Sequence, residues 1–365
     1  MTGAKGDQVH IRRFEEKDKA GLIELFDKVF GAEAGRYTSD EDWEWLSGVS
    51  PYEPVYRFIG ADDEAVVSHY AAMPVRIKAG RQEIKAQLAS SIVTDKRYRR
   101  LGLFSNLFKV SVSKARDDDY VFSYGFPNKN SIALGVKQLG WTVVSSLPVL
   151  VKISRPVNAL GKKIKHSCSG PLAVKADTLF ADVTRGMMPK AAPVRLDPFV
   201  GLDKGFDDLW EKAKDQFPIA CVRKACYLNW RYVLKPDNRY IRLKAVLNKE
   251  TTGYGVGFSE DRYGLTIGYI MDVLTSGKQT ALFHFIMQSL EDELQSRGVD
   301  IISALCNPSD PYYRLFLRRG YFPLPERFFP HQAFFVCLVP DDNPEKPFLC
   351  SAKNWHLTWG DTDVV

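Results

Sequence analysis

One stretch, from Val93 to Phe108, constrains the fold of this chain more than any other, because three local patterns meet in it. A short β-branched run ends at Val93, a basic turn containing Gly102 follows, and an amphipathic run continues to Phe108. This order predicts a strand, a tight turn and a helix. A glycine-bearing turn that opens a helix leaves backbone N–H groups unpaired at the positive end of the helix dipole. The stretch therefore predicts an anion site, and its arginines favour a pyrophosphate.

The turn resembles motif A of the GNAT superfamily of acyl-CoA-dependent acyltransferases, which reads Arg/Gln-x-x-Gly-x-Gly/Ala. Arg99 and Gly102 match this motif, whereas Phe104 stands where the family has glycine or alanine. The resemblance implies that the turn binds acyl-CoA, with acetyl-CoA as the default. Without a ligand, the same residues would form an ordinary basic β-turn-α connection. The residues implied for cofactor binding are Ile92, Val93, Arg99, Arg100, Leu101, Gly102, Leu103, Phe104, Ser105 and Asn128.

A second motif, from Gly125 to Trp141, supports this resemblance. Family members have a strand, a polar residue and a helix that ends in Leu-Gly-Phe/Trp, and Leu139, Gly140 and Trp141 match that ending. The periodicity along residues 1–153 predicts the order β-α-α-β-β-β-α-β-α-β, which is the order of a GNAT domain. The expected fold class is α/β (α+β), with a mixed, mostly antiparallel sheet flanked by helices.

The second half of the chain weakly repeats the first, which predicts a second GNAT-like domain over residues 194–345. Trp45 and Trp230, for example, each lie six residues before a proline. The strand expected before Gly277 leads into a turn that lacks the Arg-x-x-Gly frame. The second copy is therefore expected either to shape the acceptor pocket or to be structural only, and acyl-CoA is expected in the first domain.

Two further segments complete the expected organisation. Residues 154–193 have little periodicity and several prolines and glycines, which is typical of a linker or an excursion between domains. Residues 346–365 contain two tryptophans, which a disordered tail rarely carries, so this tail is expected to pack on the body.

Composition excludes several classes of function. The net charge of +6 is not gathered into a dense basic patch, so nucleic acid is not expected as a partner, whereas a small anion is. There is no apolar run of about 18 residues and no hydrophobic signal region, so a cytoplasmic protein without a membrane span is expected. The six cysteines form no CxxC pair or Cys/His cluster, so no metal site is expected. The oligomeric state is left open.

Acyl transfer from a thioester to an amine requires a proton acceptor and donors for the oxyanion. His69 is the first candidate base, because it is the only histidine in the strands that lead towards the expected cleft. Asp361 and Asp363 are alternatives, since carboxylates also suit the hydroxyls of a sugar. A structural histidine and solvated terminal carboxylates are the competing interpretations.

The acid that protonates the leaving thiolate is less well defined. The resemblance implies a tyrosine four residues before the terminal glycine of the late helix, but Val136 occupies that position. Ser131 is therefore the candidate replacement, with Asn128, Tyr124 or water as further alternatives.

The layout as a whole resembles tandem-GNAT sugar-nucleotide N-acyltransferases of bacterial surface-polysaccharide pathways. This resemblance implies direct transfer of an acyl group from acyl-CoA to the amine of a nucleotide-linked amino sugar, in a ternary complex. The alternatives are a tandem-GNAT enzyme for another amine, such as a peptide or an aminoglycoside, and a non-catalytic acyl-CoA-binding protein.

Overall fold

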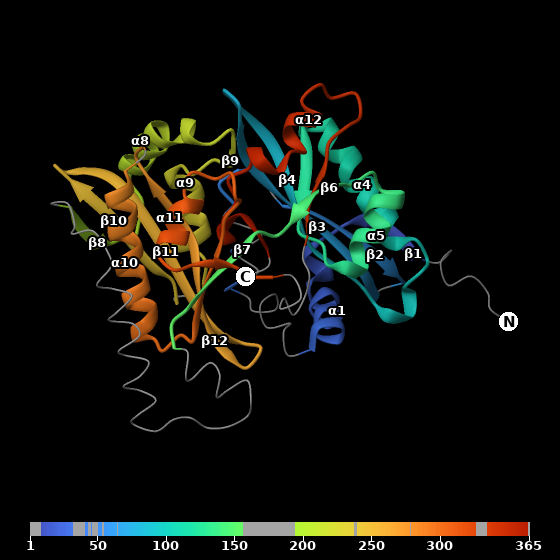
Figure 1. Ribbon diagram of the computed structural model, residues 1–365. Helices are drawn as coiled ribbons and strands as arrows, with labels where there is room; N and C mark the ends of the chain where they lie inside the picture. The colour runs from blue at the N-terminus through green and yellow to red at the C-terminus, as the bar shows by residue number, and fades with distance from the viewer. Residues whose placement is uncertain are drawn as a thin grey trace. The chain divides into compact units, whose positions relative to one another are not determined.

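A computed structural model describes residues 9–31, 41–42, 45, 50–52, 55–63, 65–155, 194–236, 239–277, 279–325 and 334–363 (Figure 1). The chain forms two compact units. The first unit comprises residues 1–145, 234–236 and 333–350, and the second comprises residues 146–233, 237–332 and 351–365. Residues 156–193, which make up most of the expected linker, lie outside the described residues.

The first unit is built on a mixed sheet in the order β1-β2-β3-β4-β5-β15-β6. Neighbours from β1 to β4 are antiparallel, β4 and β5 are parallel, and β15 is antiparallel to β5. The strands are β1 (Val9–Arg13), β2 (Tyr56–Asp62), β3 (Ala65–Ala79), β4 (Gln82–Thr94), β5 (Phe122–Gly125), β6 (Thr142–Ser146) and β15 (Phe334–Leu338).

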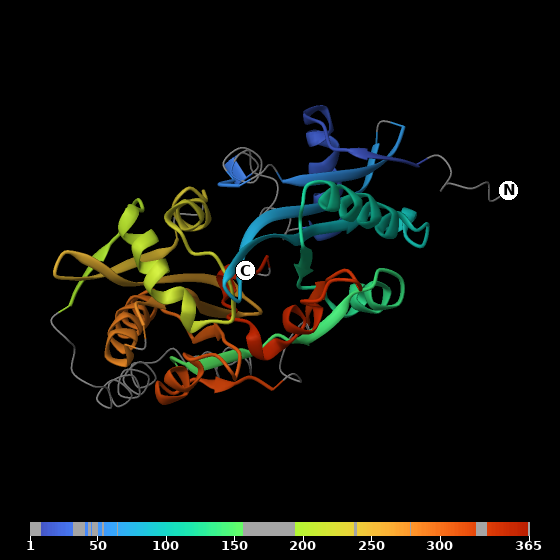
Figure 2. The same cartoon turned by 90° about the horizontal axis from the view of Figure 1, so that it is seen from above.

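Two helices cover opposite faces of this sheet, as the alternation of side chains along β2 requires (Figure 2). Ile59 of β2 belongs to a core cluster with Leu22 of α1 (Lys19–Phe30). The preceding residue, Phe58, points the other way and joins a cluster with Leu107 of α4 (Leu103–Asp117). Leu22, Ile59 and Leu107 are fully buried, and each such side chain stabilises the fold by about 1.5–3 kcal/mol. The remaining helices of the unit are α5 (Lys129–Gln138) and α12 (Lys346–Leu349).

The second unit repeats this plan, with a sheet in the order β14-β7-β13-β12-β11-β10-β8. Its long helix α10 (Thr280–Ser296) packs directly over β11, where glycines allow close approach: a Cβ on Gly255 would lie 2.6 Å from Ile286. The strands of this sheet are β7 (Val149–Ile153), β8 (Arg195–Pro198), β10 (Ile241–Leu247), β11 (Glu250–Arg262), β12 (Leu265–Thr275), β13 (Ile301–Leu305) and β14 (Phe322–Pro323). The short strand β9 (Ile219–Cys221) is not part of this sheet. The shorter helices are α8 (Lys204–Ala213), α9 (Ala225–Leu228) and α11 (Tyr313–Arg318).

The two units exchange one strand each. β7 follows β6 in the chain but pairs with β13 and β14 of the second sheet. β15 follows β14 but lies between β5 and β6 in the first sheet. The units therefore differ from the expected domains 1–153 and 194–345 by one strand in each direction. Both exchanged strands are short and mostly apolar, and β7 is also tied to the second unit by the buried ion pair of Lys152 with Glu291 at 2.7 Å.

Among the described residues, no helix is both long and apolar enough to cross a membrane. The end of the chain is built into the second unit, where Trp355, Leu357 and Trp359 are all buried.

Candidate acyl-donor site

The basic turn is held in place by two of its own residues, Asp95 and Tyr98. We call residues 95–105 the cradle turn. Asp95, which is buried, accepts a hydrogen bond from the backbone N–H of Arg97 at 2.8 Å, and its own N–H donates to Val67 at 2.9 Å. Tyr98 is also buried, and its hydroxyl donates to Asp62 at 2.5 Å. These contacts anchor the turn to the sheet and fix the direction in which it enters α4.

The arginines of the cradle turn divide into a structural one and two exposed ones. Arg97 forms an ion pair with Asp95 at 3.0 Å, and Lys28 reaches the same carboxylate at 3.1 Å. Hydrogen bonding to Arg97 is the main reason that the pKa of Asp95 lies far below its usual range. Arg99 and Arg100, in contrast, are exposed and form no ion pair within the described part of the chain. Their guanidinium groups are therefore available to an anion.

The start of α4 supplies backbone donors beside these arginines. Gly102 precedes the helix at φ 76°, in the left-handed region that glycine adopts without strain, and Arg100 has φ 70°. The first helical bond of α4 is donated by Asn106 to the carbonyl of Gly102, at 3.0 Å. The N–H groups of residues 103–105 therefore have no acceptor within the helix, and the helix dipole adds positive potential at the same place.

The strand that leads into the cradle turn separates from its neighbour before the turn begins. Parallel pairing of β4 with β5 ends at Ala89 and Gly125, whereas β4 continues to Thr94. Beyond Ala89, β4 also carries a bulge at Ser91, which has φ 49° and shifts the register against β3. Over its last residues, the edge of β4 towards β5 therefore has no strand partner among the residues that the structure describes. Ile92 and Val93, which were predicted to contact the cofactor, lie in this part of the strand.

His69 lies on β3 directly beside the bulge of β4. Its Nδ1 is 2.7 Å from the carbonyl oxygen of Ser91, and its ring meets Phe26 edge-on with centroids 5.5 Å apart. Only 2% of the residue is exposed, and burial lowers its pKa to about 3, so the imidazole is neutral at ordinary pH. Its Nε2 has no hydrogen-bond partner among the described residues. The structure therefore places His69 beside the end of β4, as predicted from its strand, but its imidazole is buried rather than exposed to solvent.

Ser131 and Asn128 come together at the start of α5. The side-chain oxygen of Asn128 accepts a hydrogen bond from the N–H of Ser131 at 3.2 Å, and the Ser131 hydroxyl is 3.5 Å away. This contact caps the helix that follows β5. Ser131 is partly buried, so its hydroxyl keeps access to solvent.

Phe104, the departure from the motif, packs into the core of the first unit. Its ring contacts Phe108 at 6.4 Å and Trp141 at 6.0 Å between centroids. Trp141 in turn covers Gly135 so closely that a Cβ there would lie 2.0 Å from the indole ring. The large residue in the motif and the tryptophan after α5 therefore form one aromatic contact, and Gly135 makes room for it.

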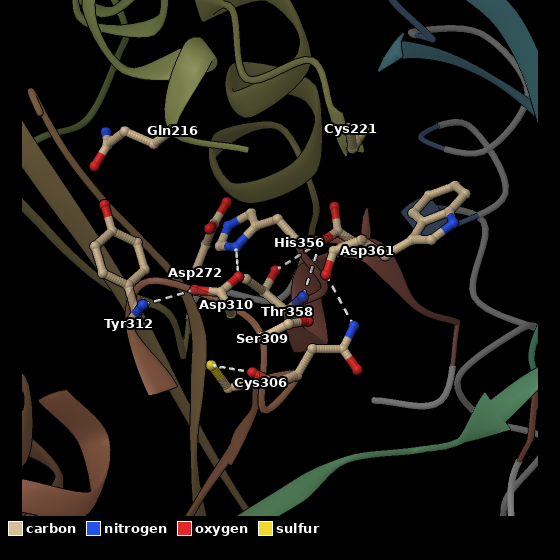
Figure 3. A network of polar contacts seen from close by, with 12 residues as sticks. Gln216, Cys221, Asp272, Cys306, Ser309, Asp310, Tyr312, His356, Thr358 and Asp361 are labelled. Atoms are coloured by element: carbon tan, nitrogen blue, oxygen red, sulfur yellow. Dashed lines mark hydrogen bonds and ion pairs between the residues drawn. The ribbon is translucent and has the colours of Figure 1, made fainter. Parts of the chain in front are cut away.

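The two carboxylates of the tail have different environments within the second unit. Asp361 is buried and forms an ion pair with Arg223 at 2.7 Å. It also accepts a hydrogen bond from the N–H of Thr358 at 2.9 Å (Figure 3). Arg223 also pairs with Asp272, so Asp361 belongs to a buried charge network. Asp363 as a whole keeps part of its surface exposed, but burial of its carboxyl group raises its pKa to about 7.

The second unit has a strand separation of its own, but its side chains fill it. Pairing of β12 with β13 ends at Ile270 and Ala304, and β12 continues to Thr275. The hydroxyl of Tyr312 accepts a hydrogen bond from the N–H of Thr275 at 3.0 Å. Gly277 follows with φ 72°, as Gly102 does in the first unit. The second turn thus keeps the glycine of the first, while the Tyr312 hydroxyl occupies the backbone donor at the end of β12.

One buried pair escaped sequence analysis. His356 Nδ1 lies 2.5 Å from Asp310 (Figure 3). The imidazole ring stacks on Phe217 with centroids 4.0 Å apart. No local sequence pattern predicts a contact between residues that are so far apart in the chain. The only relevant signal was the alternation of polar and apolar residues in the tail, which indicates that the tail packs on the body but does not identify the partner of His356. No group of three or more His, Cys, Asp or Glu residues in the described part of the chain could hold a metal ion.

Known proteins resemble this chain in part of its sequence and in its fold. Residues 10–144 match the protein-family model described as Acetyltransferase (GNAT) domain. No curated protein sequence matches the chain. Among solved structures, the Saccharomyces cerevisiae N-myristoyltransferase with bound myristoyl-CoA is similar at a TM-score of 0.61 and 12% identity, covering 96% of this chain and 89% of that one.

Two further similar structures come from bacteria. A probable N-acyltransferase from Enterococcus faecalis V583 has a TM-score of 0.61 and 10% identity, covering 91% of this chain and 72% of that one. A GCN5-related N-acetyltransferase from Anabaena variabilis has a TM-score of 0.60 and 12% identity, with coverage of 91% and 72%. These similarities confirm the predicted fold class of two GNAT-like domains. Together with the family match, they support an N-acyltransferase enzyme.

Proposed function

We propose that this chain is an acyl-CoA-dependent N-acyltransferase whose first unit binds the donor at the cradle turn. The observation that carries the proposal is the combination of the exposed Arg99 and Arg100 with the open start of α4, at the end of a strand that has separated from β5. Such a combination suits a pyrophosphate next to an extended chain that can pair with a strand edge. The whole arrangement lies within the residues that match the GNAT family model.

The donor would run from the cradle turn along the unpaired end of β4. Arg99, Arg100 and the N–H groups at the start of α4 would bind the pyrophosphate, while Ile92 and Val93 would offer backbone groups to the pantetheine arm. The filled strand separation of the second unit supports a single donor site in the first, because Tyr312 already uses the backbone donor at Thr275. Acetyl is the default acyl group, and longer groups deserve testing because one similar structure is described with bound myristoyl-CoA.

The reaction is a direct transfer. The nitrogen of a neutral amine attacks the thioester carbon, the carbon–sulfur bond breaks, and coenzyme A leaves as a thiol after the nitrogen has given up a proton. We assign the proton acceptor to His69, whose buried imidazole is neutral at ordinary pH, although its low pKa makes it a weak base. Asp363 is the main alternative, because a carboxyl group with a pKa near 7 suits proton transfer at neutral pH. Asp361 is a weaker candidate, since Arg223 already binds its carboxylate. Ser131 is the candidate donor to the leaving sulfur.

The acceptor that we propose is the amine of a nucleotide-linked amino sugar. This part of the proposal rests on the resemblance of the tandem layout to sugar-nucleotide N-acyltransferases, because the fold alone does not specify the acceptor. Peptide and aminoglycoside amines are the competing acceptors.

Thiol release tests the activity and the acceptor together. The full chain is incubated with acetyl-CoA or longer acyl-CoA esters and with a panel of dTDP- and UDP-linked amino sugars, peptides and aminoglycosides. We expect thiol release that depends on the amine and is fastest with a nucleotide-linked amino sugar. Turnover with peptides alone would reject the acceptor, and tight CoA binding without turnover on any amine would reject the enzyme.

Matched arginine variants test the donor site separately. Arg99→Gln and Arg100→Gln should each weaken CoA binding about tenfold, because a charge-assisted hydrogen bond at an exposed site contributes at least about 1.5 kcal/mol. Arg97→Gln is the control, since Asp95 already binds that guanidinium. Isothermal titration calorimetry measures all three variants. An equal loss of CoA affinity in Arg97→Gln would show that the effect depends only on the net charge of the turn. Unchanged CoA affinity in Arg99→Gln and Arg100→Gln would show that CoA does not bind at the cradle turn.

A further inference from the structure

Two cysteines of the first unit lie against each other at the end of the sheet. Cys337 is on β15 and is completely buried, whereas Cys350 follows α12 and is partly exposed. The sulfur of Cys337 is 3.9 Å from the carbonyl oxygen of Leu349, the residue before Cys350, and the two thiols are within hydrogen-bonding reach of each other. Both are free thiols in this structure. A buried thiol therefore faces a solvent-accessible one.

The surroundings favour the ionised form of the outer thiol. Hydrogen bonding to Cys337 is the main reason that the pKa of Cys350 is lowered to about 7, and a hydrogen bond from Thr142 and the positive charge of Lys346 act in the same direction. Lys346 also pairs with Asp341, so its charge is shared. The pKa of Cys337 is raised well above its usual value by burial. One thiol is thus a nucleophile near neutral pH and its neighbour remains protonated.

The other cysteines that the structure describes have no such arrangement. Burial raises the pKa of Cys221 to about 12 and the pKa of Cys306 well above its usual value. Cys226 is exposed, yet its pKa is also raised, with burial of its sulfur as the main cause. Among these residues, only Cys350 combines exposure with a stabilised thiolate and an adjacent thiol.

We propose that Cys350 and Cys337 form a peroxide-sensitive thiol pair, in which Cys350 is the attacking thiolate and Cys337 is the resolving thiol. The Cys350 thiolate displaces an alkoxide or hydroxide from a hydroperoxide and becomes a sulfenic acid, and the released oxyanion takes a proton to leave as an alcohol or water. The Cys337 thiol then attacks that sulfur, a disulfide forms, and one water leaves. The hydroperoxide is the two-electron oxidant, and a dithiol reductant reverses the change.

The position of the pair connects it with the sheet that carries the donor site. Cys337 pairs with Tyr124 of β5, and the next pair along is Val336 with Gly125, the residue at which β4 and β5 separate. A disulfide would tie β15 to the end of α12 at this point. The thiol pair stands apart from the proposed acyl transfer, so its chemistry can be tested without any substrate.

Peptide mapping after peroxide treatment tests the pair directly. The full chain is reduced, exposed to hydrogen peroxide at pH 7, alkylated and cut with a protease specific for glutamate, which separates the two cysteines at Glu345. We expect the two resulting peptides to stay joined, with loss of two hydrogens and full release by dithiothreitol. Separate, alkylated peptides under conditions that oxidise other thiols would overturn the proposal.

Rates and variants assign the two roles. At pH 7 about half of a thiol with pKa 7 is ionised, against about 1% at pKa 9, and the lower intrinsic nucleophilicity of the more acidic thiolate reduces this advantage. Cys350 should therefore react about fivefold faster than Cys226. Cys337→Ser should accumulate a sulfenic acid at Cys350 that dimedone traps, whereas Cys226→Ser should behave as the wild type. Equal rates at Cys350 and Cys226, or no trapped sulfenic acid in Cys337→Ser, would contradict the assignment.

Discussion

Replacing Gly102 by valine tests whether the backbone of the cradle turn binds the donor. Gly102 has φ 76° and ψ 3°, and a side chain in this left-handed region costs about 1–2 kcal/mol, more for a β-branched residue. Space is not the obstacle, because the nearest atom to an added Cβ is the side-chain nitrogen of Asn106, at 4.0 Å. The strain is therefore in the backbone, and its relief would rotate the N–H groups that follow away from the anion.

The chain offers a matched control for this strain. Gly264, in the hairpin between β11 and β12, has φ 75°, and an added Cβ there would meet nothing within 4 Å. Gly264→Val should therefore lower the free energy of unfolding by about the same 1–2 kcal/mol as Gly102→Val. The control reproduces the strain at a place with no donor site.

The two variants should differ in CoA binding. Loss of one backbone-to-phosphate hydrogen bond of about 1.5–3 kcal/mol should weaken binding about tenfold to a hundredfold in Gly102→Val, with no change in Gly264→Val. Isothermal titration calorimetry gives the affinity, and urea unfolding followed by circular dichroism gives the stability. If Gly102→Val loses the same stability as the control but binds CoA within twofold of the wild type, the cradle turn does not bind the donor.

Four further predictions concern groups outside the turn. His69→Ala should lower kcat about a hundredfold at unchanged KM for acyl-CoA if His69 is the base, and an unchanged kcat would remove it from the mechanism. Burial lowers the pKa of His69 to about 3, so His69 is protonated in the unfolded chain before it is protonated in the folded chain as the pH falls below 6.5. The free energy of unfolding should therefore decrease by about 2 kcal/mol between pH 7 and pH 5. Urea unfolding of His69→Gln should not show this decrease. Asp363→Asn should remove a limb near pH 7 from the profile of kcat/KM if Asp363 is the base, and an unaltered profile would exclude it. Glu291→Gln should destabilise the protein by about 3–5 kcal/mol in urea unfolding, because Glu291 lies 2.7 Å from both Lys152 and Arg319 in the core; a loss below about 1 kcal/mol would show that the two cations are compensated elsewhere.

Local pattern was sufficient to predict the cradle turn and the class of fold. The strand, the glycine and the helix up to Phe108 are signalled by neighbouring residues, so each could be read without tertiary information. The same holds for α5, where Gly140 ends the helix at φ 70°. The GNAT-like fold of both units follows from the order of such local elements.

The roles of individual side chains depended on contacts that sequence spacing does not encode. The sequence does not distinguish the roles of Arg97, Arg99 and Arg100. In the structure, Asp95 forms an ion pair with Arg97 and with neither of the other two. Asp361 and Asp363 also look alike, yet Arg223, distant in sequence, binds one of them. The buried position of His69 depends on helix α1 on one side and on the bulge of β4 on the other. Such differences arise from packing between remote segments, which a single sequence leaves open.

The exchange of β7 and β15 makes the duplicated halves of the chain interdependent. A fragment that ended at residue 153 would lack β15 and leave β5 with an unpaired edge, which is a template for aggregation. A fragment that began at residue 194 would lack β7, which β13 and β14 both pair with. Either half on its own would therefore lack one strand of its own sheet, and we expect neither to fold independently. The half without the arginine-bearing turn thus supplies β15, which completes the sheet of the half that carries this turn.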